Sequence, residues 1–120
     1  MPCYLVGQIL ISDPETYEYY TQGFAKLFRG YQARLIAMDD DPTVLEGSWN
    51  FTRFAILEFA SREEAERWYY AEEYQRISKA FRWVSSSGTL LLVDGMERPL
   101  DAARRKPAAH QESGAAAGGD

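Results

Sequence analysis

The amino-acid sequence predicts an α+β domain whose strands and helices follow the order β-α-β-β-α-β. Two helix-start signals, each directly after an apolar run, support this order: Asp13 before Pro14, and Ser61 with Glu64 three residues later. The third observation is the apolar run from Phe54 to Phe59, which is too short for a helix and rich in large side chains. Each half of the domain therefore has a strand that leads into a helix.

The first half begins with a strand over residues 3–11, which is almost continuously apolar. Asp13 is the expected N-cap of the following helix, and Pro14 fits its first position. Gly30 is the expected terminator. The apolar face of this helix recurs at steps of three and four residues: Tyr17, Tyr20, Phe24, Leu27, Phe28 and Tyr31.

The second half opens with a strand over residues 33–38, followed by a loop or short hairpin over residues 44–50. A third strand covers about residues 52–59. Ser61 and Glu64 form the pattern of a capping box, in which each residue binds a backbone amide of the other.

The helix after Ser61 shows two phases of apolar residues, which suggest a kink near residues 71–73. Ala65, Trp68 and Tyr69 belong to the first phase; Tyr74, Ile77, Phe81 and Val84 belong to the second. Residues 85–88 form an expected break, and residues 89–93 the last strand.

These elements predict a ferredoxin-like fold with a four-stranded antiparallel sheet and both helices on one face. The opposite face would be substantially apolar, because the first, third and fourth strands lack a clean polar and apolar alternation. A large exposed apolar face favours association, so the sequence predicts a homodimer in which a second copy covers the sheet.

A change in composition separates a domain over residues 1–96 from a tail over residues 97–120. The tail is rich in Ala, Gly, Pro and Arg, and we expect it to be disordered because it buries too little apolar surface to offset its ordering entropy.

The charge distribution argues against nucleic acid as a partner. Before Glu97 the chain has 9 Lys and Arg against 14 Asp and Glu, so the whole formal net charge of −5 belongs to the domain. Phosphate neutralisation by basic residues supplies most nucleic-acid affinity, and no basic stripe is present.

Cysteine and histidine are too rare for several common kinds of site. Cys3 and His110 are the only residues of their types, so we expect no disulfide framework and no histidine or thiolate metal site in the domain. A Ser-His-Asp catalytic group is equally unexpected. No apolar run is long enough to span a membrane and no secretory signal is evident, so we expect a cytoplasmic protein with no metal.

Several motifs resemble the family known as domain of unknown function 1330. They are residues 4–14, Leu45-Glu46-Gly47, Arg53, Arg82, and the stretch from Glu58 to Gln75 with Ala65, Trp68, Tyr69 and Tyr74. Met38 stands where that family often has an arginine. The resemblance covers about residues 3–95 and implies the dimeric α+β barrel superfamily. That superfamily includes cofactor-independent oxygenases of aromatic polyketides, isomerases, cyclases and haem-handling enzymes, whose ligands usually lie between sheet and helices.

Three charged residues are candidates for catalysis. Glu58 is a carboxylate inside an apolar strand and would act as a general base if it faced a pocket between sheet and helices. The alternatives are an ion pair with Arg53 or Arg82, or a solvated carboxylate at the strand end. Arg53 and Arg82 would hold an anionic or enolic substrate; the alternative is a structural ion pair with Glu46 or Glu58.

Five further residues are candidates for ligand binding. Gln8 lies mid-strand and would bind a ligand carbonyl or make a cross-strand hydrogen bond. Trp49 and Trp68 would stack on a flat ligand. Trp49 would do so from a loop that closes over the mouth of a pocket, and the alternative for Trp68 is a core residue. Tyr69 and Tyr74 would donate hydrogen bonds, or would be core residues with a solvated hydroxyl.

The sequence therefore favours a small-molecule enzyme that acts without a cofactor on an aromatic or polyketide-like metabolite. Proton transfer, isomerisation, cyclisation and oxygenation all fit such a pocket. Two alternatives stay open: a non-catalytic metabolite-binding dimer and a dimeric scaffold without a ligand.

Overall fold

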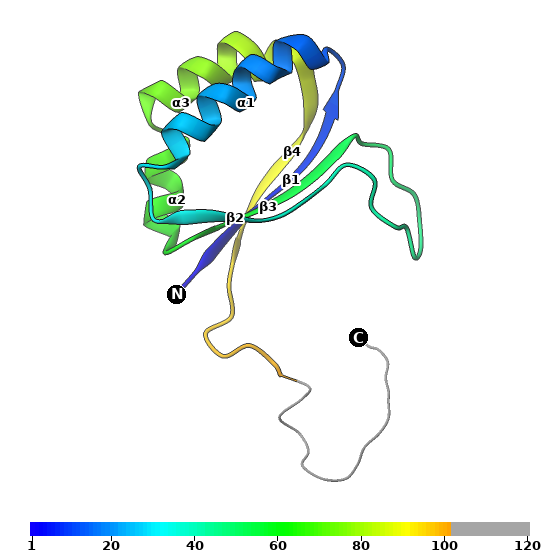
Figure 1. The fold of residues 1–120 in the computed structure, drawn as a ribbon. Coiled ribbons are helices and arrows are strands. Elements are labelled where there is room, and N and C mark those ends of the chain that lie inside the picture. Colours follow the sequence, from blue (N-terminus) through cyan, green and yellow to red (C-terminus); the bar gives the residue numbers. More distant parts are fainter. Residues whose placement is uncertain (102–120) are drawn as a thin grey trace.

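The computed structural model describes residues 1–101 and shows one antiparallel sheet with all helices on one face (Figure 1). The strand order is β2-β3-β1-β4, and every neighbouring pair is antiparallel. The predicted ferredoxin-like α+β fold is thus confirmed. Its elements are β1 (Cys3–Ile11), α1 (Pro14–Phe28), β2 (Ala33–Asp39), β3 (Arg53–Phe59), α2 (Arg62–Tyr69), α3 (Glu72–Ile77), the π-helix η1 (Ser78–Arg82), α4 (Trp83–Ser85) and β4 (Ser86–Asp94).

Both predicted helix starts are present. The Asp13 carboxylate accepts a hydrogen bond from the Thr16 amide at 3.3 Å, and the Ser61 hydroxyl accepts one from the Glu64 amide at 3.1 Å. The second half of the capping box was predicted wrongly. The Glu64 carboxylate turns to the amide of Gln32, at 2.9 Å, and to Arg67, and so ties α2 to the entry of β2.

The expected kink is a complete break between α2 and α3, with Ala71 extended as the residue before Glu72. Two details of the following segment differ from expectation. The chain passes through a π-helical turn before α4, and β4 starts at Ser86 rather than near Thr89 because residues 86–88 pair with β1. Val84, expected on the buried face, is 67% exposed.

Alternation along the strands gives the sheet two different faces. Leu5 pairs with Leu57, and both are buried on the helix-covered side. Tyr4 pairs with Glu58 and therefore points to the opposite side, which we call the bare face. In the described residues that face carries Leu10, Leu91 and Val93 as exposed large apolar side chains.

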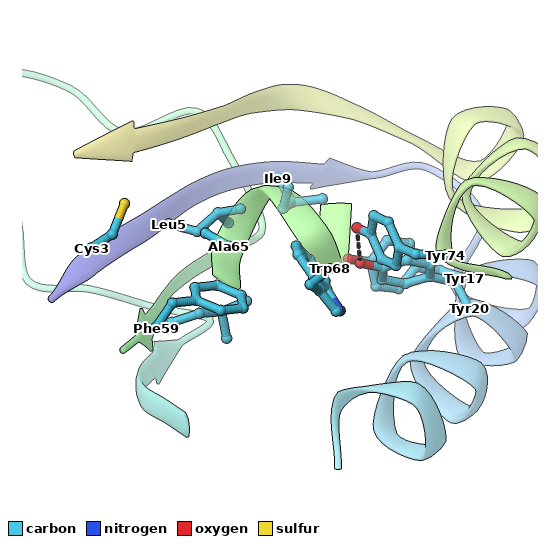
Figure 2. Close-up of a cluster of buried hydrophobic side chains, with 10 residues drawn as sticks. Cys3, Leu5, Ile9, Tyr17, Tyr20, Phe59, Ala65, Trp68 and Tyr74 are labelled. Carbon is cyan, nitrogen blue, oxygen red and sulfur yellow. Dashed lines mark hydrogen bonds between the residues drawn. The ribbon is translucent and has the colours of Figure 1, made fainter. Parts of the chain in front are cut away.

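The core lies between sheet and helices and is dominated by aromatic rings. Figure 2 shows Trp68 at its centre, with Phe59 and Ala65 toward one end and three tyrosines at the other. Trp68 packs on Tyr74 with ring centroids 4.1 Å apart and on Phe59 at 5.4 Å. Cys3 is buried, as expected for a small apolar side chain, and burial raises the pKa of its thiol.

Residues 40–52 join β2 to β3 as a long connection that projects from the end of the sheet (Figure 1). No strand forms within it, so the loop and not the hairpin is the correct alternative. No helix in residues 1–101 is long and apolar enough to cross a membrane. The predicted tail lies mostly outside the described residues.

Candidate functional site

A cavity of about 360 Å³ lies between the helix-covered face of the sheet and the helices. Apolar side chains from β1, β3 and β4 form its base, and α1, α2, α3 and η1 supply the other walls. Its lining residues are Leu5, Gly7, Ile9, Tyr17, Glu18, Tyr20, Thr21, Phe24, Ala25, Leu35, Met38, Arg53, Ala55, Leu57, Trp68, Tyr74, Arg82 and Leu90.

The cavity opens between α1 and β2. Leu35 and Met38 of β2 are 46% and 53% exposed although they line it, and Glu18 of α1 is exposed as well. The helices contact β2, at this edge of the sheet, less than α2 contacts β1 and β3. A ligand can therefore reach the apolar interior from the side of β2.

Two tyrosine hydroxyl groups meet at the inner end of the cavity. The Tyr20 and Tyr74 hydroxyl oxygens are 2.7 Å apart, and both side chains are buried (Figure 2). Burial, followed by the neighbouring Tyr74, raises the pKa of Tyr20 well above its usual value, against the opposing effect of Arg82. Tyr20 is therefore a neutral phenol at physiological pH and acts as a hydrogen-bond donor or acceptor.

Arg82 lies beside this pair. Its guanidinium carbon is 5.8 Å from the centre of the Tyr20 ring and 6.0 Å from that of Tyr74, which are cation–π distances. Its Nε atom is buried and has no hydrogen-bond partner among the described residues. Arg82 also makes no ion pair with any described residue. The alternative predicted for it, a structural ion pair with Glu46 or Glu58, is therefore not formed.

Arg53 lines the same cavity but is already paired. Its Nε and Nη2 atoms donate to the two carboxylate oxygens of Asp40 at 2.8 and 3.0 Å. The expected partners Glu46 and Glu58 were wrong, because the start of β3 lies beside the end of β2. The Arg53 guanidinium also lies 5.9 Å from the Tyr17 ring, and burial raises the pKa of Tyr17.

Glu58 does not meet the condition set for a general base. It points to the bare face, outside the cavity lining, where its carboxylate accepts from Arg34 Nε at 2.5 Å and from the Tyr4 hydroxyl at 3.3 Å. The hydrogen bond from Arg34 lowers the pKa of this carboxyl. A lowered pKa disfavours proton uptake, and neither Arg53 nor Arg82 is its partner.

Two predicted ligand-binding residues also lie away from the cavity. Gln8 is on the bare face, where its amide oxygen lies 3.5 Å from the Thr89 hydroxyl across the strands. Trp49 packs on Phe51 and Phe54 with centroids 5.2 and 6.1 Å apart, on the side of the sheet that Phe54 shares with Gln8. Its loop therefore does not close this cavity in the structure.

Of the remaining predicted residues, some line the cavity and one does not. Trp68 and Tyr74 line the cavity, whereas Tyr69 borders a separate, smaller hollow beside β4. Sequence reasoning placed Tyr17 and Tyr20 on the apolar face of α1 but gave them no role. The available signal was their hydroxyl groups, since a face that needed only packing would be satisfied by phenylalanine.

One end of the cavity therefore has a cationic hydrogen-bond donor, Arg82, and neutral donors, the hydroxyl groups of Tyr20 and Tyr74. The rest of its wall is mostly apolar and aromatic. Such an arrangement can bind a planar molecule and stabilise negative charge on one of its oxygens. Among the described residues, no group of three or more His, Cys, Asp or Glu is placed to hold a metal ion.

The model of one family matches residues 2–96, nearly the whole of the described chain. The chain belongs to the DUF1330 family. This family is described only as a domain of unknown function, so membership fixes the relationship and leaves the activity open. No curated protein matches the chain.

Solved structures similar to this DUF1330 member share its fold at low sequence identity. A protein of unknown function from Rhodopseudomonas palustris, RPA0582, is 12% identical, with a TM-score of 0.67 over 81% of this chain and 84% of that one. SnoaB, a cofactor-independent oxygenase from Streptomyces nogalater, is also 12% identical, with a TM-score of 0.55 over 81% and 95%. A dimeric ferredoxin-like protein of unknown function from Thermobifida fusca is 9% identical, with a TM-score of 0.52 over 76% and 90%.

Proposed function

We propose that this protein is a small-molecule enzyme that acts, without a cofactor, on an aromatic or polyketide-like metabolite. The observation that carries the proposal is the cavity itself: about 360 Å³, mostly apolar, with Arg82 and the Tyr20–Tyr74 pair at its inner end. Ligand sites of enzymes commonly combine an apolar enclosure with a few convergent polar groups.

The chemistry that suits this site begins with loss of a proton from a carbon next to a carbonyl, or from a phenol hydroxyl group. The resulting negative charge rests on an oxygen, and Arg82 with a tyrosine hydroxyl is suited to stabilise it. Isomerisation, cyclisation and, with dioxygen as the oxidant, oxygenation can each start from such an anion. The similarity to SnoaB supports this choice of chemistry only through the shared fold.

Glu18 replaces Glu58 as our candidate proton acceptor. It is the one carboxylate among the described residues that line the cavity, whereas Asp40 is occupied by Arg53. Its position near the open side would let a proton pass from substrate to solvent.

The test begins with a thermal-shift screen of the full chain against aromatic and polyketide-like metabolites. A ligand present at 100 times its Kd stabilises the fold by about 2.7 kcal/mol, which is readily detected. Conversion of each hit is then followed by mass spectrometry. We expect Glu18→Gln to lower turnover strongly and Glu58→Gln, the matched change on the bare face, to leave it unchanged. Equal turnover in both variants would exclude Glu18 as the proton acceptor.

A non-catalytic metabolite-binding protein is the second candidate. This candidate is favoured because the described residues place no unpaired carboxylate deep in the cavity that could accept a proton. Glu18 is exposed at the open side, and Asp40 is paired with Arg53. A binding protein predicts hits in the thermal-shift screen that are recovered chemically unchanged. A scaffold without a ligand predicts no hits.

We also propose that the protein is a homodimer through its bare face. Leu91 and Val93 are 56% and 45% exposed on that face, and the similar protein from Thermobifida fusca is itself dimeric. Exposed large apolar side chains on an uncovered sheet face favour association with a second copy.

A further inference from the structure

Arg82 differs from Arg53, the other arginine in the cavity lining, because the described residues supply no carboxylate partner for it. It is the last residue of η1, a single π-helical turn between two α-helical segments. Such turns cost hydrogen-bond geometry and often occur at functional sites. Here the turn ends with the Arg82 side chain among buried aromatic rings.

The Arg82 side chain is half-buried, and its Nε–H is a buried donor without a partner, which is unfavourable. Cation–π contacts with Tyr20 and Tyr74 compensate the charge from the faces of the two rings. They leave the in-plane N–H of Nε, which is buried and unpaired, without an acceptor. An acceptor placed in the cavity would satisfy it.

The tyrosine pair supplies a second donor at the same place. Two hydroxyl groups 2.7 Å apart share one hydrogen bond, in which one of the two protons lies between the oxygens. The other hydroxyl proton is not used in that bond and is free to point into the cavity. A neutral phenol beside an arginine is a favourable pair of donors for one carboxylate or enolate group.

The charges around the cavity balance except at Arg82. Arg53 is neutralised by Asp40 through two hydrogen bonds, and Glu18 lies exposed at the open side. The half-buried Arg82 therefore brings to the cavity one positive charge that no carboxylate of the described residues pairs with. A ligand with a single negative charge matches it, whereas a second negative group would lie on apolar walls or near Glu18.

We infer that the natural ligand is an aromatic monoanion whose carboxylate-like group binds Arg82 and the Tyr20–Tyr74 pair. Its flat apolar body lies along Trp68, toward Leu35 and Met38. The inference rests on the proposed function, since it names the class of molecule that occupies the same cavity, and it adds that the bound form carries one negative charge, held at Arg82.

Calorimetric titration of the full chain with three matched probes tests this inference. The probes are 2-naphthoate, its uncharged methyl ester and naphthalene-2,6-dicarboxylate. We expect 2-naphthoate to bind at least about tenfold more tightly than the ester, because charged hydrogen bonds of this kind exceed about 1.4 kcal/mol. The dicarboxylate should bind more weakly than the monoanion.

Arg82→Met should remove the preference for the acid over the ester without weakening the ester. Lys79→Met, which removes one positive charge from an exposed position on the same turn, should leave the preference intact. If circular dichroism shows that Arg82→Met does not fold, Arg82→Lys takes its place. Lysine keeps the charge without the planar fork, so it should reduce the preference in a folded protein.

Equal binding of acid and ester by the wild-type protein overturns the inference and leaves the proposed function standing. Retention of the full preference in Arg82→Met also overturns it. If neither compound binds, the inference fails together with the proposal that this cavity holds small aromatic molecules.

Discussion

At the scale of single residues, the Tyr20–Tyr74 pair ties α1 to α3 through one buried hydrogen bond and an edge-on ring contact. Removing either hydroxyl leaves the other without its partner in an apolar setting. We expect Tyr20→Phe and Tyr74→Phe each to lower the free energy of unfolding by about 1 kcal/mol. The double variant should cost less than the sum of the two, since both single changes break the same bond.

Urea denaturation of the three variants measures this coupling. Purely additive losses would show that the two hydroxyl groups are satisfied independently, for example by water. The matched control is Tyr19→Phe, which removes a hydroxyl group from the exposed side of α1 and should leave stability unchanged.

The Asp40–Arg53 pair gives the cavity rim a pH dependence of known sign. The hydrogen bond from Arg53 lowers the pKa of Asp40 below its ordinary value of 3.8. A carboxyl whose pKa is lowered on folding stabilises the fold above its ordinary pKa, and this stabilisation disappears as the pH falls through the folded-state pKa.

We therefore expect the melting temperature of the wild-type protein to exceed that of Asp40→Asn by a constant amount between about pH 5 and pH 7. The difference should shrink below about pH 4, where the carboxylate takes up its proton. Its size should be small, below about 1 kcal/mol, because the carboxylate is half exposed. A difference that persists unchanged in strong acid would contradict this assignment.

The two helix caps could be predicted, whereas Glu64, expected to bind the Ser61 amide, binds the amide of Gln32 instead. Asp13 and Ser61 cap their helices through amides three residues away, so the pattern contains the whole interaction. Glu58 was different, because its partner Arg34 is set by the pairing of β2 with β3. The face that Glu58 occupies follows from its place between the buried Leu57 and Phe59, but its partner follows from the register of β2, which spacing within one strand does not reveal.

At the scale of elements, β4 depends on a glycine. Gly88 has φ +140°, and a Cβ there would lie 2.0 Å from the Gln8 carbonyl oxygen of β1. Both features exclude other residues, because the conformation is strained for L-amino acids and the clash is with backbone. We expect Gly88→Ala to destabilise the fold by more than about 2 kcal/mol.

Gly47→Ala is the matched control for this prediction. Gly47 also has a positive φ, of +89°, but a Cβ there meets nothing within 4 Å. Gly47→Ala should therefore lower the free energy of unfolding only by the backbone strain, about 1 kcal/mol. Chemical denaturation of both variants separates the clash from the strain, and equal losses would show that the close approach of β4 to β1 contributes nothing.

The same glycine explains why the start of β4 was predicted too late. Serine and glycine residues at 85–88 are typical of a break, yet residues 86–88 pair with β1 because Gly88 permits the close approach. A kink near residues 71–73 was predicted, since the phase of the apolar residues changes there, and the structure has a complete break. The π-turn of η1 was not, because an added residue in a helix has no signature in so short a segment.

At the scale of the whole molecule, the order of elements and the apolar bare face followed from the sequence, whereas the composition of the cavity did not. The strand pattern requires helices on one face and therefore a core between the layers. Which side chains line a cavity depends on packing between α1, η1 and the sheet. Arg82, chosen as a candidate because it stands on an otherwise apolar helix, lines the cavity, whereas Glu58 and Trp49 do not. The role of Arg82 in binding or catalysis stays a prediction.

The bare face leads to a prediction about assembly. Leu91 pairs in register with Val6 and is 56% exposed, so it would be buried when a second sheet packs on the first. Leu91→Asp places a charge in that interface, where it has no partner, and should convert a dimer into a monomer at micromolar concentration. Val84→Asp, a comparable change at an exposed apolar residue of the helical layer, should remain dimeric. Sedimentation velocity of both variants and the wild type measures this, and a monomeric wild-type protein would show that the apolar face is not covered by a second copy.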